Sequence, residues 1–280
     1  MKETVTERLR HPERRGNHME INSSPIHVEN LPDLKEPLLV AAFEGWNDGG
    51  QAASNTIRRL IKALNAEKFA WFDPEEFYVH TETRPEVRLV DGRFRKIEWQ
   101  TNEFYHARIP DTGRDLVLFL GTEPQLKWKT FCRHFLTLAR QVGVHHLVTL
   151  GGYLADTLYT LPIQINGFSN DEAFEQRYDL QRTNYEGPTG IVGVLSNLGQ
   201  QEEFQVLSLW AAVPYYISIP NPKAVHALLS KLTEVYDFSI DLSSLEADAN
   251  SFDNEINNIV AKDPNVAAYV RELKKRDFLN

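Results

Sequence analysis

Four side chains that could do chemistry follow an apolar run near residue 40. Glu44, Trp46, Asn47 and Asp48 come directly after the run 37–43. Such a run is typical of a buried strand that ends in a turn. In open α/β sheets, ligands bind in the crevice outside the carboxyl ends of the strands. The turn is therefore a candidate site. Its two carboxylates are suited to acid–base work, to a metal or to a polar ligand.

Each residue of this turn also has a structural interpretation. Asp48 has the spacing of a helix N-cap with Gln51 as its partner, and such a cap alone contributes about 1 kcal/mol. We favour the cap for Asp48. Glu44 has no capping duty to explain it, so bonding to backbone amides and a functional role both stay open. Trp46 is either an interface anchor or stacking platform, or a lid over the core between strand and helix.

A third carboxylate, Glu123, follows the apolar run 116–120 and precedes a helix by one turn. A Glu near a helix N-terminus is stabilised by roughly 0.3–1 kcal/mol through the helix dipole, which would explain it without a function. However, Glu44 and Glu123 both follow predicted strands of one sheet. If those strands are neighbours, the two carboxylates would meet in one crevice.

Two glycine-containing turns complete the candidate crevice. Gly152 follows the apolar run 146–150 and would allow a close backbone approach, although an ordinary turn also explains it. Thr189 lies in Gly187-Pro188-Thr189-Gly190, where free N–H groups at a helix start could bind an anion. The loop lacks the lysine of a P-loop, and a helix start alone accounts for it. The candidate crevice is thus formed by Glu44, Trp46, Asn47, Asp48, Glu123, Gly152 and Thr189.

The sequence lacks the signatures of several enzyme classes. No HxxxH or HExxH spacing occurs, and one cysteine cannot build a thiolate zinc site, so we expect no metal and no cofactor. Cys132 lies on an apolar helix with no adjacent His, which argues against a nucleophile. Ser196 lacks the GxSxG elbow of a serine hydrolase. No residue can be named as catalytic.

The apolar pattern predicts an α/β fold with a mostly parallel sheet flanked by helices. Strands are expected at 38–43, 68–72, 116–120, 146–150 and 206–213, and helices at 48–64 and 128–142 and after Gly187, Asn221 and Asp241. This βα alternation favours parallel strands covered on both faces. The segments 86–90 and 93–99, joined by Asp91-Gly92, predict a β-hairpin inserted between two strands of the sheet.

Three segments are expected along the chain. Residues 1–24 are predicted to be a disordered arm, 25–238 the α/β domain, and 239–280 a helical hairpin packed on it.

The bulk properties exclude several classes of protein. The net charge of −9 argues against nucleic acid as a partner. No apolar run reaches the roughly 18 residues needed to span a bilayer, and the N-terminus has no signal-peptide core. The single cysteine excludes an internal disulfide. Together these features predict a cytoplasmic protein with no membrane partner.

Four motifs, in this order, resemble those of the PAC2 family, which is named after a proteasome assembly chaperone. They are Phe43-Glu44-Gly45-Trp46-Asn47-Asp48, Gly121-Thr122-Glu123-Pro124 followed by Trp128 and Phe131, Gly187-Pro188-Thr189-Gly190, and Leu209-Trp210-Ala211-Ala212-Val213-Pro214-Tyr215. The resemblance covers about residues 30–275 and is greatest to the actinobacterial branch. It implies a fold similar to purine nucleoside phosphorylases and related hydrolases, a homo-oligomer, and a role in assembling proteasome α-rings.

The C-terminal tail departs from the family pattern. In the archaeal members that engage the proteasome, the chain ends in a docking tail of three residues. These are a hydrophobic residue, Tyr and any residue. This chain ends in Phe278-Leu279-Asn280, with Leu279 at the place of that Tyr. The tail-docking mode therefore does not carry over to this chain.

These observations favour a protein-binding assembly chaperone or scaffold, with proteasome subunits or another protein as the client. The alternative is an enzyme or small-ligand binder that uses Glu44, Asp48 and Glu123, and a third is a scaffold whose crevice binds a ligand without turning it over. A deep polar crevice would support the alternatives. A filled crevice beside an exposed apolar patch would support protein binding.

Overall fold

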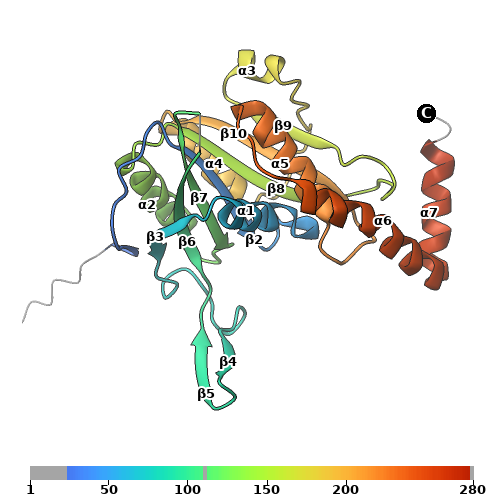
Figure 1. Cartoon of the computed structure of the whole chain (residues 1–280), viewed down its shortest axis with the longest axis horizontal. Helices are drawn as coiled ribbons and strands as arrows, with labels where there is room; N and C mark the ends of the chain where they lie inside the picture. Colours follow the sequence, from blue (N-terminus) through green and yellow to red (C-terminus); the bar gives the residue numbers. More distant parts are fainter. Residues whose placement is uncertain (1–23, 110–111, 278–280) are drawn as a thin grey trace, which may run out of the picture.

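A mixed sheet of eight strands forms the centre of the molecule, in the order β1-β3-β6-β7-β2-β8-β10-β9. The computed structural model describes residues 24–109 and 112–277. The predictions made for residues 1–23 and for Leu279 lie outside these ranges. Figure 1 shows the sheet crossing the middle of the molecule with helices on both sides.

The middle of the sheet is parallel and its margins are antiparallel. The parallel strands are β7 (Asp115–Thr122), β2 (Leu38–Glu44), β8 (His146–Ala155) and β10 (Gln205–Pro214). The antiparallel strands are β6 (Asn102–Arg108), β3 (Glu67–Phe72) and β1 (Ile26–Val28) on one side and β9 (Ile165–Ser169) on the other. The predicted α/β fold is confirmed.

Helices cover both faces of the sheet, and β2 shows how the sequence encodes this. Leu38, Val40 and Ala42 contribute to a core with helices α1 (Ala52–Ala63) and α5 (Pro222–Tyr236). Leu39, Ala41 and Phe43 contribute to a second core with α2 (Trp128–Gln141) and α4 (Ile191–Gln201). Successive side chains of a strand point to opposite faces, so a strand covered on both sides is a continuous apolar run.

The predicted hairpin is present as a separate two-stranded sheet. It consists of β4 (Glu86–Val90) and β5 (Phe94–Glu98), and Asp91 and Gly92 between them have φ values of 51° and 66°. Two successive positive φ values match the turn type that the Asp-Gly pair predicts. In Figure 1 the hairpin extends away from the rest of the molecule.

The C-terminal segment is helical, as expected. Helix α6 (Ser243–Lys262) lies along α5 and is followed by α7 (Pro264–Asp277), at the edge of the view in Figure 1. A third apolar cluster joins these two helices to the loops after β8 and β10. None of the described helices is long and apolar enough to cross a bilayer.

Several details of the sequence-based predictions were wrong. The fourth strand does not end at Leu150, because β8 pairs with β10 through Gly152 to Ala155. The first helix begins at Ala52 instead of residue 48, after a short 3-10 turn at Gly49–Gln51. The third strand of the chain, β3, is antiparallel to its neighbours. The short elements β1, β6, β9 and α3 (Glu172–Arg177) were missed because they carry little apolar periodicity.

Candidate functional site

Glu123 joins three loops at the carboxyl edge of the parallel strands. Its Oε1 accepts hydrogen bonds from Asn47 Nδ2 and from the backbone N–H of Ile191, both at 2.8 Å. Its own backbone N–H donates to the Glu44 carbonyl at 2.9 Å. Ile191 is the first residue of α4, so the carboxylate lies at a helix N-terminus, where the dipole favours it. The sequence order had indicated that Glu123 stabilises α2. The helix that it stabilises in the structure is α4.

The loop before α4 lies too close to Asn47 and Glu123 to admit a side chain at Gly190. A Cβ placed there would lie 2.2 Å from Asn47 Nδ2 and 2.6 Å from Glu123 Oε1. Glycine at this position lets the loop before α4 approach the two side chains directly. The Gly187-Pro188-Thr189-Gly190 motif is thus explained at its last residue by packing against Asn47 and Glu123.

Asn47 and Gly152 connect the loop after β2 to strand β8. Asn47 is 1% exposed, and its carbonyl accepts a hydrogen bond from the Gly152 N–H at 2.8 Å. A Cβ on Gly152 would lie 2.4 Å from the Gly49 carbonyl oxygen, so the two backbones approach closely at Gly152, which lies within β8 and not in a turn. The Oδ1 of Asn47 is buried and has no hydrogen-bond partner among the described residues.

Asp48 stabilises the start of α1. Its Oδ1 accepts hydrogen bonds from the N–H groups of Ala53 at 2.9 Å and Ser54 at 3.1 Å, both in the first turn of the helix. Gln51, with φ of 49°, occupies the N-cap position itself. Burial raises the pKa of Asp48 above its ordinary value, and these hydrogen bonds oppose the shift in part.

Glu44 and Glu123 follow neighbouring strands, as the hypothesis required, and their carboxylates have different partners. Glu44 pairs in register with Thr122 of β7, and its carboxylate forms an ion pair with Arg58 of α1. The Glu123 carboxylate binds Asn47 and the start of α4 instead. Trp46 is 62% exposed and does not serve as a lid over the core.

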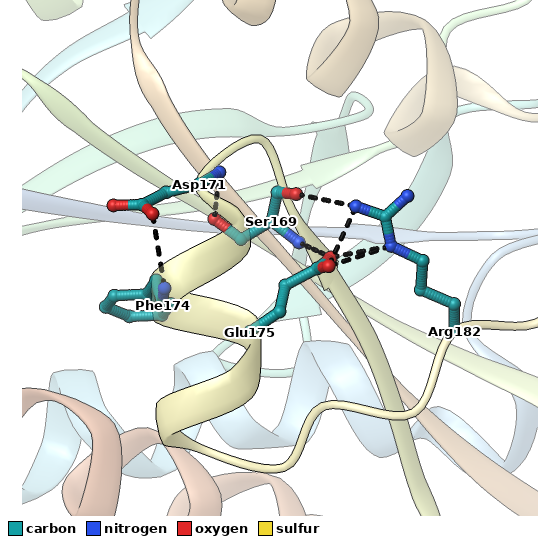
Figure 2. Close-up of polar contacts among 5 residues, drawn as sticks. All are labelled: Ser169, Asp171, Phe174, Glu175 and Arg182. Carbon is teal, nitrogen blue, oxygen red and sulfur yellow. Dashed lines mark hydrogen bonds and ion pairs between the residues drawn. The ribbon is translucent and has the colours of Figure 1, made fainter.

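Thr189 is exposed, on the loop before α4. Figure 2 shows a polar cluster that holds an earlier part of the same connection, between β9 and this loop. Glu175 of α3 accepts a hydrogen bond from the Ser169 N–H at 2.6 Å and from Arg182 Nε at 2.9 Å. Arg182 Nη2 also donates to the Ser169 carbonyl at 3.3 Å. Asp171 caps α3 by accepting from the Phe174 N–H at 3.2 Å. The cluster fixes the segment that leads from β9 to the Thr189 loop, and no sequence motif indicated it.

Burial raises the pKa of the Cys132 thiol to about 12, so it is not an activated nucleophile. Within the described residues, no group of three His, Cys, Asp or Glu side chains could hold a metal ion. A pocket of about 430 Å³ lies between α1, α5 and α6, and none of the candidate crevice residues lines it.

The hairpin carries a group of exposed apolar side chains, which we call the hairpin patch. Leu89 is 64% exposed and Phe94 is 69% exposed. Val87 pairs with Ile97 and shares a face with Leu89, whereas Val90 pairs with Phe94 on the opposite face beside the turn. The patch consists of Val87, Leu89, Val90, Phe94 and Ile97, together with Trp99 just after β5.

The root of the hairpin is fastened to the same carboxyl edge as the candidate crevice. The Tyr78 hydroxyl donates to the Thr122 carbonyl at 2.6 Å, and Asn102 Nδ2 donates to Tyr78 at 2.5 Å. Trp99 contacts His80 edge-on, with ring centroids 4.8 Å apart. Tyr78 and Asn102 are buried, and sequence reasoning missed both because no motif surrounds them.

Comparisons with known proteins agree on the family. The model of the PAC2 family matches residues 42–260. A PAC2 family protein from Streptomyces avermitilis is 42% identical, with a TM-score of 0.77 over 84% of this chain and 99% of its own. A proteasome-assembly chaperone homologue from Mycobacterium tuberculosis is 39% identical, with a TM-score of 0.77 over 83% of this chain and 99% of its own.

More distant structures share the fold. An archaeal proteasome activator from Pyrococcus furiosus is 22% identical, with a TM-score of 0.67 over 84% of this chain and 97% of its own. No curated protein matches the chain. The family model spans most of the folded part, and the two more similar structures come from actinobacteria, in line with the predicted branch. The chain belongs to the PAC2 family.

Proposed function

We propose that this chain is an assembly chaperone or scaffold that acts by binding other proteins in the cytoplasm, and that the hairpin patch is part of its binding surface. Membership of the PAC2 family supports an assembly-chaperone-like role, as does the similarity to a protein described as a proteasome-assembly chaperone homologue. The observation that carries the proposal is the exposed apolar hairpin on a buried, hydrogen-bonded root.

An exposed hairpin of this kind is costly unless it meets a partner. A two-stranded hairpin is at best marginally stable alone in water, and its outer edges present unpaired backbone groups. Large apolar side chains gathered on one projection mark interaction sites more often than scattered ones do. Phe94 and Trp99 are of the aromatic class that is enriched in interfaces. A protein partner would bury these side chains and cover the edges.

Proteasome subunits are the client that the relatives suggest, and a second copy of the chain is a further partner. We assign the client contact to the hairpin, because its apolar side chains are exposed. The alternative of an enzyme is not favoured. Asp48 and Glu123 are held by first-turn N–H groups of α1 and α4, and Glu44 by Arg58.

The test compares partners captured from native cytosol by tagged wild type and by the double variant Leu89→Ser/Phe94→Ser. Both side chains are more than half exposed, so the variant keeps the core intact. The matched control is Val28→Ser/Leu31→Ser, which changes two exposed apolar residues, one at the end of β1 and one just after it.

Mass spectrometry of the captured proteins, with size exclusion of the chain alone, gives the readout. We expect wild type and control to retain proteasome subunits or another stoichiometric client, and the hairpin variant to lose it. Capture of the same client by all three proteins would contradict the role of the hairpin. Absence of any client from the wild type would contradict the chaperone role.

A further inference from the structure

The pocket between α1, α5 and α6 has features of a binding site separate from the hairpin. Its volume of about 430 Å³ falls within the range of about 300–1,000 Å³ that is usual for small-molecule sites. Figure 1 shows α1, α5 and α6 running close together on one side of the sheet. The opposite face of the sheet carries α2 and α4, so the pocket does not communicate with that core.

One wall of the pocket is basic because the cationic residues of α1 lie on the same face of the helix. Residues at i, i+3, i+4 and i+7 lie on the same side of a helix. On α1 the apolar residues Ile57 and Leu60 face the core, and the pocket wall is formed by Asn55, Arg58, Arg59 and Lys62. Three cations thus gather on one helical face of a chain whose net charge is −9.

The facing wall is apolar. It is formed by Pro220, Pro222, Val225 and Leu245, from the start of α5, the residues before it, and α6. Val225 and Leu245 are both buried in the core on this side of the sheet. A pocket with one basic wall and one apolar wall can accommodate a molecule whose two ends differ in the same way.

The cations keep capacity for an anion. Arg58 is bound to Glu44 and Asn55, and Arg59 to Asp248 and Ser244, all through the terminal guanidinium nitrogens. Each guanidinium has five N–H donors, so donors remain for a further acceptor. Lys62 is exposed and has no ion pair with any residue in the described ranges. The wall therefore has a surplus of positive charge.

We infer that this pocket binds a small organic anion whose carboxylate or phosphate contacts Arg58, Arg59 and Lys62 and whose apolar body lies against Val225, Leu245 and the two prolines. Arginine holds planar carboxylates and phosphates with paired hydrogen bonds, and lysine adds a mobile point charge. Arg58 also binds Glu44, the residue before the loop that carries Trp46 and Asn47, so the site adjoins that loop.

Thermal unfolding and calorimetric titration of the full chain test this inference with four probes. Phenyl phosphate and benzoate combine an anionic group with an apolar body, and they separate a preference for phosphate from one for carboxylate. Inorganic phosphate has the charge alone, and benzyl alcohol has the apolar body alone. We expect concentration-dependent stabilisation by at least one of the first two probes and little by the last two.

Two charge-matched variants locate the site. Lys62→Glu reverses an exposed charge that makes no ion pair in the described structure, so folding is not at risk. It should weaken the better probe about tenfold or more, because a charge-assisted contact is replaced by repulsion. Lys129→Glu makes the same change on α2, on the other side of the sheet, and should leave the affinity within about twofold, as expected of a distant charge in salt.

Three results would overturn the inference. The first is the absence of binding by phenyl phosphate and benzoate at millimolar concentration. The second is equal binding by inorganic phosphate, which would mean that the apolar wall contributes nothing. The third is equal affinity in Lys62→Glu and wild type. None of these results depends on the hairpin, so the proposed chaperone role stands or falls separately.

Discussion

Removal of the Glu123 carboxylate is the perturbation whose cost the structure defines best. In Glu123→Ala, the amide of Asn47 and the N–H of Ile191 lose their acceptor. Both residues are almost fully buried, at 1% and 0% exposure. An unpaired buried donor costs about 1–3 kcal/mol, and Glu123 itself is half-buried, so that water can replace part of the loss. We expect the free energy of unfolding to fall by about 2–3 kcal/mol, or the Tm by roughly 5–10 °C.

The isosteric variant Glu123→Gln separates the acceptor from the charge. Its side-chain oxygen still reaches both donors, and only the favourable charge at the N-terminus of α4 is lost, which is worth roughly 0.3–1 kcal/mol. Urea denaturation of wild type and both variants at one pH, with the m-values compared, gives the measurement. A Glu123→Ala variant as stable as wild type would refute the reasoning. If Glu123→Ala and Glu123→Gln lose the same free energy of unfolding, then the charge of Glu123, and not its two hydrogen bonds, stabilises the contact with Asn47 and α4.

Three further predictions follow from the contacts described above. Gly190→Ala places a methyl group within 2.6 Å of polar atoms of Asn47 and Glu123, so we expect the free energy of unfolding in urea to fall by about 1–3 kcal/mol. The control Gly193→Ala should change it little, because its methyl group meets a hydroxyl that can rotate away. The pKa of Asp48 is raised by burial, so the folded chain holds a proton that the unfolded chain loses near pH 3.9. As the pH rises from about 4 towards 7, the stability of wild type should therefore fall relative to that of Asp48→Asn until the pH has passed the raised pKa. Parallel profiles of the two proteins would contradict this. Arg182→Ala opens the cluster of Figure 2 and frees Glu175, so the amides of Ser169 and Leu180, which are hydrogen-bonded to Glu175, should exchange hydrogen faster, and unchanged exchange there would show that Arg182 does not hold the cluster together.

The strongly periodic parts of the fold could be predicted from the sequence. The run 38–43, the helix after Trp128 and the Asp91-Gly92 hairpin all follow local rules of periodicity and turn chemistry, and all three are present. Strand order could not be predicted, because it depends on pairings far apart in the sequence. Strand β6 was missed because it has little apolar periodicity and lies in a polar insertion, although its pairing with β7 attaches the hairpin root to the sheet.

The candidate site shows a similar division. The sequence pointed to Glu44, Asn47, Asp48 and Glu123 because polar side chains at the ends of buried strands are conspicuous. What each one binds was decided by tertiary contacts. Glu123 reaches the start of α4, which begins at Ile191, far along the chain. No local pattern could have supplied that partner or the ion pair of Glu44.

Reconstitution of proteasome assembly from purified α and β subunits of the same organism tests the central claim most directly. The rate at which assembled particles appear on native gels would be compared without the chain, with wild type, and with Leu89→Ser/Phe94→Ser, with Val28→Ser/Leu31→Ser as the control. The account predicts faster or more complete assembly with wild type and control, and no effect of the hairpin variant. Assembly that is indifferent to wild type would contradict a proteasome-assembly role, and acceleration by the hairpin variant would contradict the surface to which we assign it.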